Sequence, residues 1–227
     1  MRFEELNWMD VEKYLEKDDR LILIIGATEQ HGYLSLETDN LIAQNLSEAG
    51  AKASGVLLAP PMKFGASHYF LAYPGTISLR VETLLAVVED MIRSAYYQGF
   101  RRFMVMNGHG GNLAIRAKLA ELNVELKDMQ SRFYSWWMTE VVADIGKKYD
   151  LIPGHANWEE AFPFTKVVPL PEGGKPFVRQ VSSNNAEKVR EILGDGSYGD
   201  KYEVSDEIMQ EVFDGCLAEI LDLLKFE

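Results

Sequence analysis

The sequence predicts an α/β fold of three layers, with helices covering both faces of a largely parallel central sheet. Short apolar runs alternate with longer helical patterns along the 227 residues. An order of strand, helix, strand requires crossover connections, which are right-handed and place helices on the faces of the sheet. Neither an internal repeat nor a linker interrupts the chain, so residues 1–227 are expected to form a single domain.

Strand and helix signals alternate through the first half of the chain. Short apolar runs bounded by glycine or proline indicate buried strands, and apolar residues at helical spacing indicate amphipathic helices. Polar caps and glycines bound the helices. The expected elements are, in order, a helix from Asn7 to about Leu15, a strand over 21–25, a helix from Asp39 to near Gly50, a strand over 56–59, and a helix over 79–98 capped by Ser78.

The second half continues the alternation and then becomes irregular. The segment 151–185 is rich in proline, glycine and polar residues and is expected to be mostly loop. The expected elements are a strand over 103–106, a helix capped by Asn112, a strand over 133–137, a helix over 138–149, a short helical piece around 158–162, and helices over 186–193 and 205–224.

The composition argues against several functional classes. The chain has 23 basic and 35 acidic residues, a net charge of −12, which disfavours binding to nucleic acid or to an anionic membrane. No apolar run approaches the length of about 18 residues that a membrane span needs, and the polar start MRFEELNWMD is not a signal peptide. Cys216 is the only cysteine and is expected to be a core thiol. These features predict a cytoplasmic protein.

One loop carries three residues suited to metal binding. It follows the strand over 21–25, and open α/β sheets place their ligand sites at the carboxyl ends of such strands. Glu29 and His31 lie two residues apart, so in extended backbone they point to the same side, and Asp39 follows before a helix. An imidazole and two carboxylates suit a metal ion. The alternative is an ordinary polar loop.

The placement of the histidines favours the metal interpretation. The chain has four, and three of them, His31, His109 and His155, lie in loops that a parallel sheet can bring to one edge. His68 lies in an aromatic loop and is expected to be a partly exposed polar residue, with contact to substrate left open.

The turn NGHGGN at 107–112 follows the third expected strand. Glycine-rich turns between a strand and a helix can bind phosphate, but the chain has no GxxxxGK motif. Leu113 also stands where a GxGxxG pattern beginning at Gly108 requires glycine. The glycines instead let the backbone pass close to a neighbouring group, and His109 suits metal ligation.

Four motifs in this order resemble the creatininase (creatinine amidohydrolase) family. They are the loop at 26–39, PGT at 74–76, NGHGGN, and HANWEEAF at 155–162. The resemblance covers nearly the whole chain, to the C-terminal GDGSYGDKYEVSDE, and it implies a two-metal amidohydrolase. One divalent ion would be held by Glu29, Asp39 and His109, and a second by His31, Asp39 and Glu160, with Asp39 bridging. Mixed nitrogen and oxygen ligands suit zinc, manganese and iron.

The resemblance also implies which residues would act on the substrate. His155 and Glu160 would be catalytic, with His155 unligated and able to give a proton to the departing nitrogen. Glu160, rather than Glu159, falls in register with the family motif. Ser67 and Trp158 would contact the substrate.

Several departures from the family concern the wall of the pocket. Gly111 stands where creatininase itself has a glutamate, a second histidine after His31 is missing, and the segment 65–70 lacks the family's Glu-His pair. These changes leave the ligand positions intact and remove polar groups around them. Creatinine is therefore not the expected substrate.

The resemblance thus predicts a metal-dependent hydrolase of a non-peptide C–N bond, in a cyclic amide or a formamide. It implies a small-molecule amide substrate and a homo-oligomer. Alternatives are a formamidopyrimidine-nucleotide deformylase of flavin or deazaflavin biosynthesis, and an enzyme that trims a modified peptide in redox-cofactor maturation. From a different class, a non-catalytic binding protein that contains metal is a further alternative.

Overall fold

The centre of the fold is a parallel sheet. The structure is a computed structural model that describes residues 1–179 and 181–227. Four strands lie side by side in the order β2, β1, β3, β4, and every neighbouring pair is parallel. The strands are β1 (Arg20–Ile25), β2 (Leu57–Leu58), β3 (Arg102–Asn107) and β4 (Gln130–Ser135).

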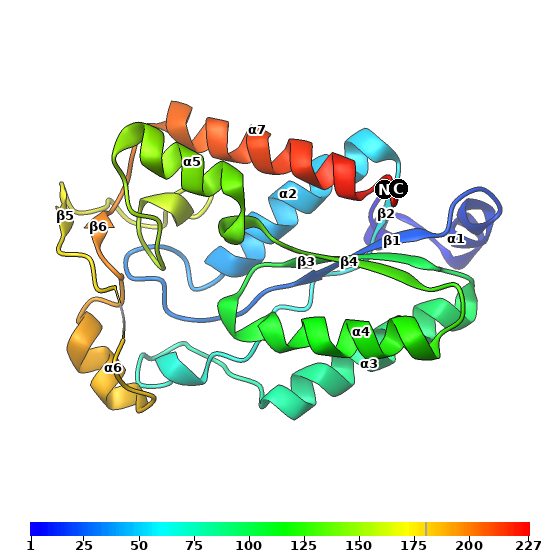
Figure 1. The fold of residues 1–227 in the computed structure, drawn as a ribbon, viewed down its shortest axis with the longest axis horizontal. Coiled ribbons are helices and arrows are strands. Elements are labelled where there is room, and N and C mark those ends of the chain that lie inside the picture. Colours follow the sequence, from blue (N-terminus) through cyan, green and yellow to red (C-terminus); the bar gives the residue numbers. More distant parts are fainter. Residues whose placement is uncertain (180) are drawn as a thin grey trace.

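Helices cover both faces of this sheet (Figure 1). Side chains alternate along β1, so that Ile22 and Ile24 enter one apolar core while Leu21 and Leu23 enter the other. The first core lies under α2 (Thr38–Ser54), α5 (Glu140–Tyr149) and α7 (Asp206–Leu223), and the second under α3 (Val81–Gln98) and α4 (Ile115–Glu125). This arrangement confirms the predicted three-layer α/β/α fold.

The order of the strands creates a crevice at one edge of the sheet. From β1 the chain runs through α2 to β2 on one side, and then returns through α3 to β3 on the other side of β1. The loops that leave β1 and β3 therefore diverge, and ligands bind at such switch points in α/β folds. The helix α6 (Ala186–Leu193) and the short strands β5 (Gly174–Lys175) and β6 (Asp200–Lys201) lie beyond this edge, whereas both termini lie at the opposite one (Figure 1).

Other sequence expectations are also confirmed. The helix α1 (Trp8–Leu15) is capped by Asn7, whose side chain accepts from the backbone N–H groups of Met9 and Asp10. Cys216 is buried and forms no disulfide. Within the described residues, no helix combines the length and the apolar character needed to cross a bilayer.

Several element boundaries differ from the prediction. The helix α2 continues past Gly50 and ends at Ser54. Gly50 does not end the helix but lets it pack closely against α7, where a Cβ atom would lie 2.8 Å from Ile220. The strand β4 begins at Gln130 rather than at 133 and ends before Trp136. It is an edge strand that starts with polar residues, so its first half lacks an apolar signal.

The predicted caps Ser78 and Asn112 are wrong. The helix α3 begins only at Val81, and the Ser78 hydroxyl accepts a hydrogen bond from the Ser67 backbone N–H at 2.8 Å. Asn112 lies within a 3₁₀ turn before α4. Its side-chain amide donates to the carbonyl of Gly26 at 3.0 Å and accepts from the N–H of Ala66 at 3.2 Å, and so joins three loops at the crevice.

We expect Asn112→Ala to destabilise the fold. The substitution leaves two buried backbone groups without their partner, at roughly 1–3 kcal/mol for each group. Asn123→Ala is the matched control, because Asn123 lies exposed on α4 and makes only a surface hydrogen bond to Ser131. Denaturant unfolding should show a lower free energy of unfolding for Asn112→Ala alone. Equal stability of the two variants would contradict the bridging role.

Candidate metal centre

Four segments deliver acidic and histidine side chains to the crevice. Glu29 and His31 lie in the loop after β1, and Asp39 lies in the first turn of α2. His109 follows β3, and Glu160 ends a short 3₁₀ helix over Trp158–Glu160. All five side chains are buried. The loops of parallel strands thus converge as the sequence predicts.

These residues form two groups that share Asp39. The first is Glu29, Asp39 and His109, and the second is His31, Asp39 and Glu160; within each group the ligand atoms lie within 4.8 Å of one another. Asp39 Oδ2 lies 3.1 Å from His109 Nδ1, whereas Asp39 Oδ1 lies 3.1 Å from His31 Nε2. Each oxygen of one carboxylate therefore faces a different histidine.

Backbone carbonyls set the proton position on both histidines. His109 Nε2 lies 3.1 Å from the carbonyl oxygen of Ala66, and His31 Nδ1 lies 3.2 Å from that of Glu29. A carbonyl oxygen only accepts, so each of these nitrogens carries the proton and donates. The opposite nitrogen of each ring is left with a lone pair directed at the carboxylates. Metal-binding histidines are held in this way in proteins.

The electrostatics of the two groups favour a cation. Burial lowers the pKa of His31, but Asp39 and Glu160 raise it by more, so that the pKa lies well above its ordinary value. His109 behaves in the same way beside Glu29 and Asp39. The groups thus attract positive charge, which can be a proton or a metal ion.

Several of the same atoms have no other hydrogen-bond partner among the described residues. They are both carboxylate oxygens of Glu29, Asp39 Oδ2 and His31 Nε2, all of them buried. Buried polar atoms without partners are costly unless an ion or a water occupies the space between them. The donor set of carboxylates and imidazoles is that of divalent zinc, manganese or iron. The residues present therefore fit divalent metal ions.

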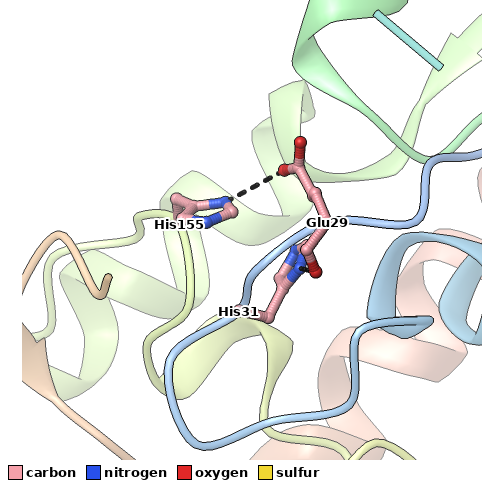
Figure 2. A group of neighbouring side chains, drawn as sticks. All are labelled: Glu29, His31 and His155. Carbon is pink, nitrogen blue, oxygen red and sulfur yellow. Dashed lines mark hydrogen bonds and ion pairs between the residues drawn. The ribbon is translucent and has the colours of Figure 1, made fainter. Parts of the chain in front are cut away.

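His155 faces the centre from a separate loop. Figure 2 shows its ring opposite the Glu29 carboxylate, with Nδ1 lying 3.8 Å from Glu29 Oε1. The ring stacks on Phe70 with 4.5 Å between ring centroids. Burial, and after it the neighbouring His31, lower the pKa of His155 to about 4. The imidazole is therefore neutral near pH 7.

A pocket of about 540 Å³ opens in front of these residues, a size typical of small-molecule sites. Ser67, the expected substrate contact, lines it, and Ser67 Oγ lies 3.4 Å from His109 Nε2. Trp158 is not among the described residues that line it. Its indole is buried behind the pocket and donates to the carbonyl of Ile152 at 3.0 Å. His68 is exposed and also lies outside the lining.

Sequence reasoning missed several residues of the pocket wall. Trp137, which was expected at the end of a strand, lines the pocket from the 3₁₀ turn after β4. Arg179 and Tyr198 line it from the irregular C-terminal third. Glu159 also reaches the lining, and burial, then its neighbour Glu160, raise its pKa well above the ordinary value. No pattern in the sequence distinguishes these residues from surface or core positions.

Gly111 is required by a close approach of two loops. A Cβ atom at this position would lie 2.0 Å from the carbonyl oxygen of Ala66 and 2.6 Å from His109 Nε2. The backbone in this conformation therefore has no room for a side chain at Gly111. A glutamate, which creatininase itself has at this position, therefore cannot be placed here without moving His109.

A family model matches the chain and, together with the ligand residues described above, shows which family the chain belongs to. The model, described as creatinine amidohydrolase, matches residues 4–224. The chain belongs to the creatininase family. A solved structure of a mutant creatininase, of Zn–Zn type, superposes with a TM-score of 0.79 at 25% identity, over 99% of this chain and 96% of the other.

Two curated relatives match parts of this creatininase-family chain. A mycofactocin precursor peptide peptidase of Mycobacterium ulcerans (strain Agy99) is 37% identical over 119 residues, 48% of this chain and 47% of the relative. A creatinine amidohydrolase of Pseudomonas putida is 30% identical over 169 residues, 68% of this chain and 64% of the relative. The chain thus spans between about half and two thirds of the length of these relatives.

We expect Asp39→Ala to remove the ions of both groups, because each oxygen of this carboxylate faces a different histidine. Glu160→Gln is the matched control: Glu160 belongs to one group only, so this variant should keep metal at Glu29, Asp39 and His109. Elemental analysis of the purified variants measures the metal content per chain. Retention of about two ions by Asp39→Ala would contradict the shared role.

Proposed function

We propose that this protein is a metal-dependent amidohydrolase that cleaves a non-peptide C–N bond in a cyclic amide or a formamide. The observation that carries the proposal is the pair of buried ligand groups that share Asp39, with a neutral histidine beside them and a pocket in front. Paired divalent ions supply Lewis acidity, which activates water and polarises a carbonyl group. Membership of the creatininase family supports this chemistry.

The protein residues have separate tasks in this proposal. Glu29, His31, Asp39 and His109 hold the ions, and the backbone carbonyls behind the histidines keep each ring in its binding orientation. Glu160 would also serve as a ligand: its Oε2 accepts a hydrogen bond from the backbone N–H of Ala156 at 2.5 Å, which leaves Oε1 facing His31 Nε2 at 3.7 Å.

His155 holds a proton close to the departing nitrogen of the substrate. Its ring is neutral and half-buried, and it belongs to neither of the two groups that share Asp39, although it also lies close enough to Glu29 and His31 to form a group with them. Loss of a bond to nitrogen needs a proton donor, and a histidine placed at the wall of the pocket is suited to that task.

The pocket wall favours a flat substrate with a negative group. Phe70, Trp137 and Tyr198 provide aromatic surface, and Arg179 provides a cation. A guanidinium group binds carboxylate and phosphate well. This feature supports the alternative of a formamidopyrimidine-nucleotide deformylase. It also agrees with a peptide carboxylate, and a relative is named a peptide peptidase.

We expect His155→Gln to keep its metal and to lower turnover by roughly 10²–10⁴-fold, the range for loss of a general acid. His68→Gln is the control, because His68 is exposed and lies outside the pocket lining. Elemental analysis and steady-state rates on one hydrolysed amide give the two readouts. If His155→Gln loses metal instead, His155 is a ligand and its assignment as proton donor is wrong.

We expect little or no hydrolysis of creatinine, and metal-dependent hydrolysis of a formamide or a small cyclic amide, best when it carries a phosphate or carboxylate. The reason is that Gly111 leaves no side chain where creatininase itself has a glutamate, whereas Arg179 presents a cation. Hydrogen bonds in a site discriminate far more strongly than apolar fit.

Steady-state rates of the metal-reconstituted protein on both substrate types decide this point. Efficient hydrolysis of creatinine would contradict the argument from the pocket wall and leave the metal centre standing. Bound metal without hydrolysis of any amide in a broad panel would instead support the non-catalytic binding protein.

A further inference from the structure

Gln30 lies between two metal-binding residues in the sequence, yet its side chain points to His155. Only 5% of Gln30 is exposed. Its amide nitrogen Nε2 lies 2.8 Å from His155 Nε2, and its own main-chain carbonyl oxygen lies 3.1 Å from the same histidine nitrogen. Both polar groups of Gln30 therefore converge on the ring nitrogen that faces away from the metal centre.

Two backbone groups fix which way the Gln30 amide points. Its Oε1 accepts a hydrogen bond from the N–H of Gly32 at 3.1 Å, and its Nε2 donates to the carbonyl of Gly196 at 3.1 Å. A flipped amide would set donor against donor at Gly32 and acceptor against acceptor at Gly196. The group that faces His155 is therefore the NH₂ group, which only donates.

Gly196 provides the room for this contact. Its φ angle is +97°, and a Cβ atom there would lie 1.7 Å from Gln30 Oε1. The turn GDGSYGD, to which Gly196 belongs, also contacts His155 directly, because the Tyr198 backbone N–H donates to the His155 carbonyl at 2.9 Å. The C-terminal turn thus supports His155 from behind.

The donor of Gln30 sets the tautomer of the neutral His155 ring. A neutral imidazole carries one proton, and its other nitrogen accepts. Two groups of Gln30 compete for Nε2: the pinned NH₂ group at 2.8 Å, which needs a bare nitrogen, and the main-chain carbonyl at 3.1 Å, which needs a protonated one. The NH₂ contact is the shorter, and the Glu29 carboxylate lies on the Nδ1 side of the ring, so the geometry places the proton on Nδ1. Nδ1 is the nitrogen 3.8 Å from Glu29 Oε1, on the side of the metal centre. When the ring is doubly protonated, the main-chain carbonyl of Gln30 can accept from Nε2 instead.

We propose that Gln30, held by Gly196, is a positioning residue that keeps a proton on the Nδ1 atom of His155, so that this histidine meets the substrate as a donor. The proposal rests on the proposed role of His155 as proton donor. It gives the GDGSYGD turn a task at the site, although Gly196 touches neither the ligand groups nor the pocket.

Nitrogen NMR of the zinc-loaded protein with ¹⁵N-labelled histidine tests the tautomer without turnover. The chain has only four histidines, and His155→Gln identifies the signals of His155. We expect Nδ1 to be protonated and Nε2 bare in the wild type. In Gln30→Glu the new carboxylate accepts from Nε2, so the proton should move to Nε2. A bare Nδ1 in the wild type, or an unchanged tautomer in Gln30→Glu, would overturn the proposal.

Two glycine variants of the same turn provide a second test. Gly196→Ala should displace the Gln30 amide and change the His155 signals. Gly194→Ala should leave them unchanged, because Gly194 also has a positive φ angle, +65°, but open space around its Cβ position. Equal signals in the two variants would contradict the contribution of Gly196.

Kinetics then show whether the tautomer matters for turnover. With metal content unchanged, Gln30→Glu and Gly196→Ala should lower kcat by about 10–100-fold, as changes behind a functional histidine do, with KM nearly unchanged. A rise in KM alone would assign Gln30 to substrate binding. If no amide is hydrolysed by the wild type, the proposed function fails, while the NMR result still decides the tautomer.

Discussion

The site depends most on the electrostatics of the buried Asp39 carboxylate. Burial raises the pKa of Asp39, but the two histidines opposite its oxygens lower it by more, so the group stays ionised. Glu29 and Glu160 lie beside it in the same buried space. Isolated charges in a protein interior cost several kcal/mol each, on the order of the stability of a whole domain. The fold therefore needs positive charge between these carboxylates, and the histidine lone pairs are oriented to share it.

The rest of the architecture follows from placing these groups together. A parallel sheet with a switch point between β1 and β3 separates two loops at its carboxyl edge. Asn112, in the loop after β3, then joins this loop to the loop after β1 through the Gly26 carbonyl and to the loop after β2 through the Ala66 N–H. The irregular C-terminal third contributes His155, Glu160 and the turn behind them, so the site combines a rigid sheet edge with a long loop. The mutant creatininase of Zn–Zn type shares this fold over 99% of the chain.

The fold class, and the meeting of most candidate ligands at one edge, could be predicted from sequence, because strand ends in a parallel sheet meet at one edge. Glu29, His31 and His109 follow strands closely, Asp39 begins the next helix, and their side chains are of the types that bind metal ions. Glu160 needed the family motif, since spacing alone does not separate it from Glu159. In the structure Glu160 faces His31, whereas the pKa of Glu159 is raised by burial.

Other features depended on contacts between distant segments. Gln30 is a neutral amide with no chemical signature, and its importance appears only when Gly196, far along the chain, is placed against it. Trp137 and Arg179 reach the pocket from a 3₁₀ turn and an irregular segment, which carry no periodic pattern. Asn112 was mistaken for a local cap because cap residues and long-range bridges use the same amide group.

A crystal structure of the purified protein, with anomalous data collected at the absorption edges of zinc, manganese and iron, tests the central claim most directly. The account predicts anomalous peaks in both ligand groups, one beside Glu29 and His109 and one beside His31 and Glu160, with an Asp39 oxygen in contact with each. A single peak away from Asp39, or a fully metal-loaded protein whose peaks lie outside these groups, would contradict it.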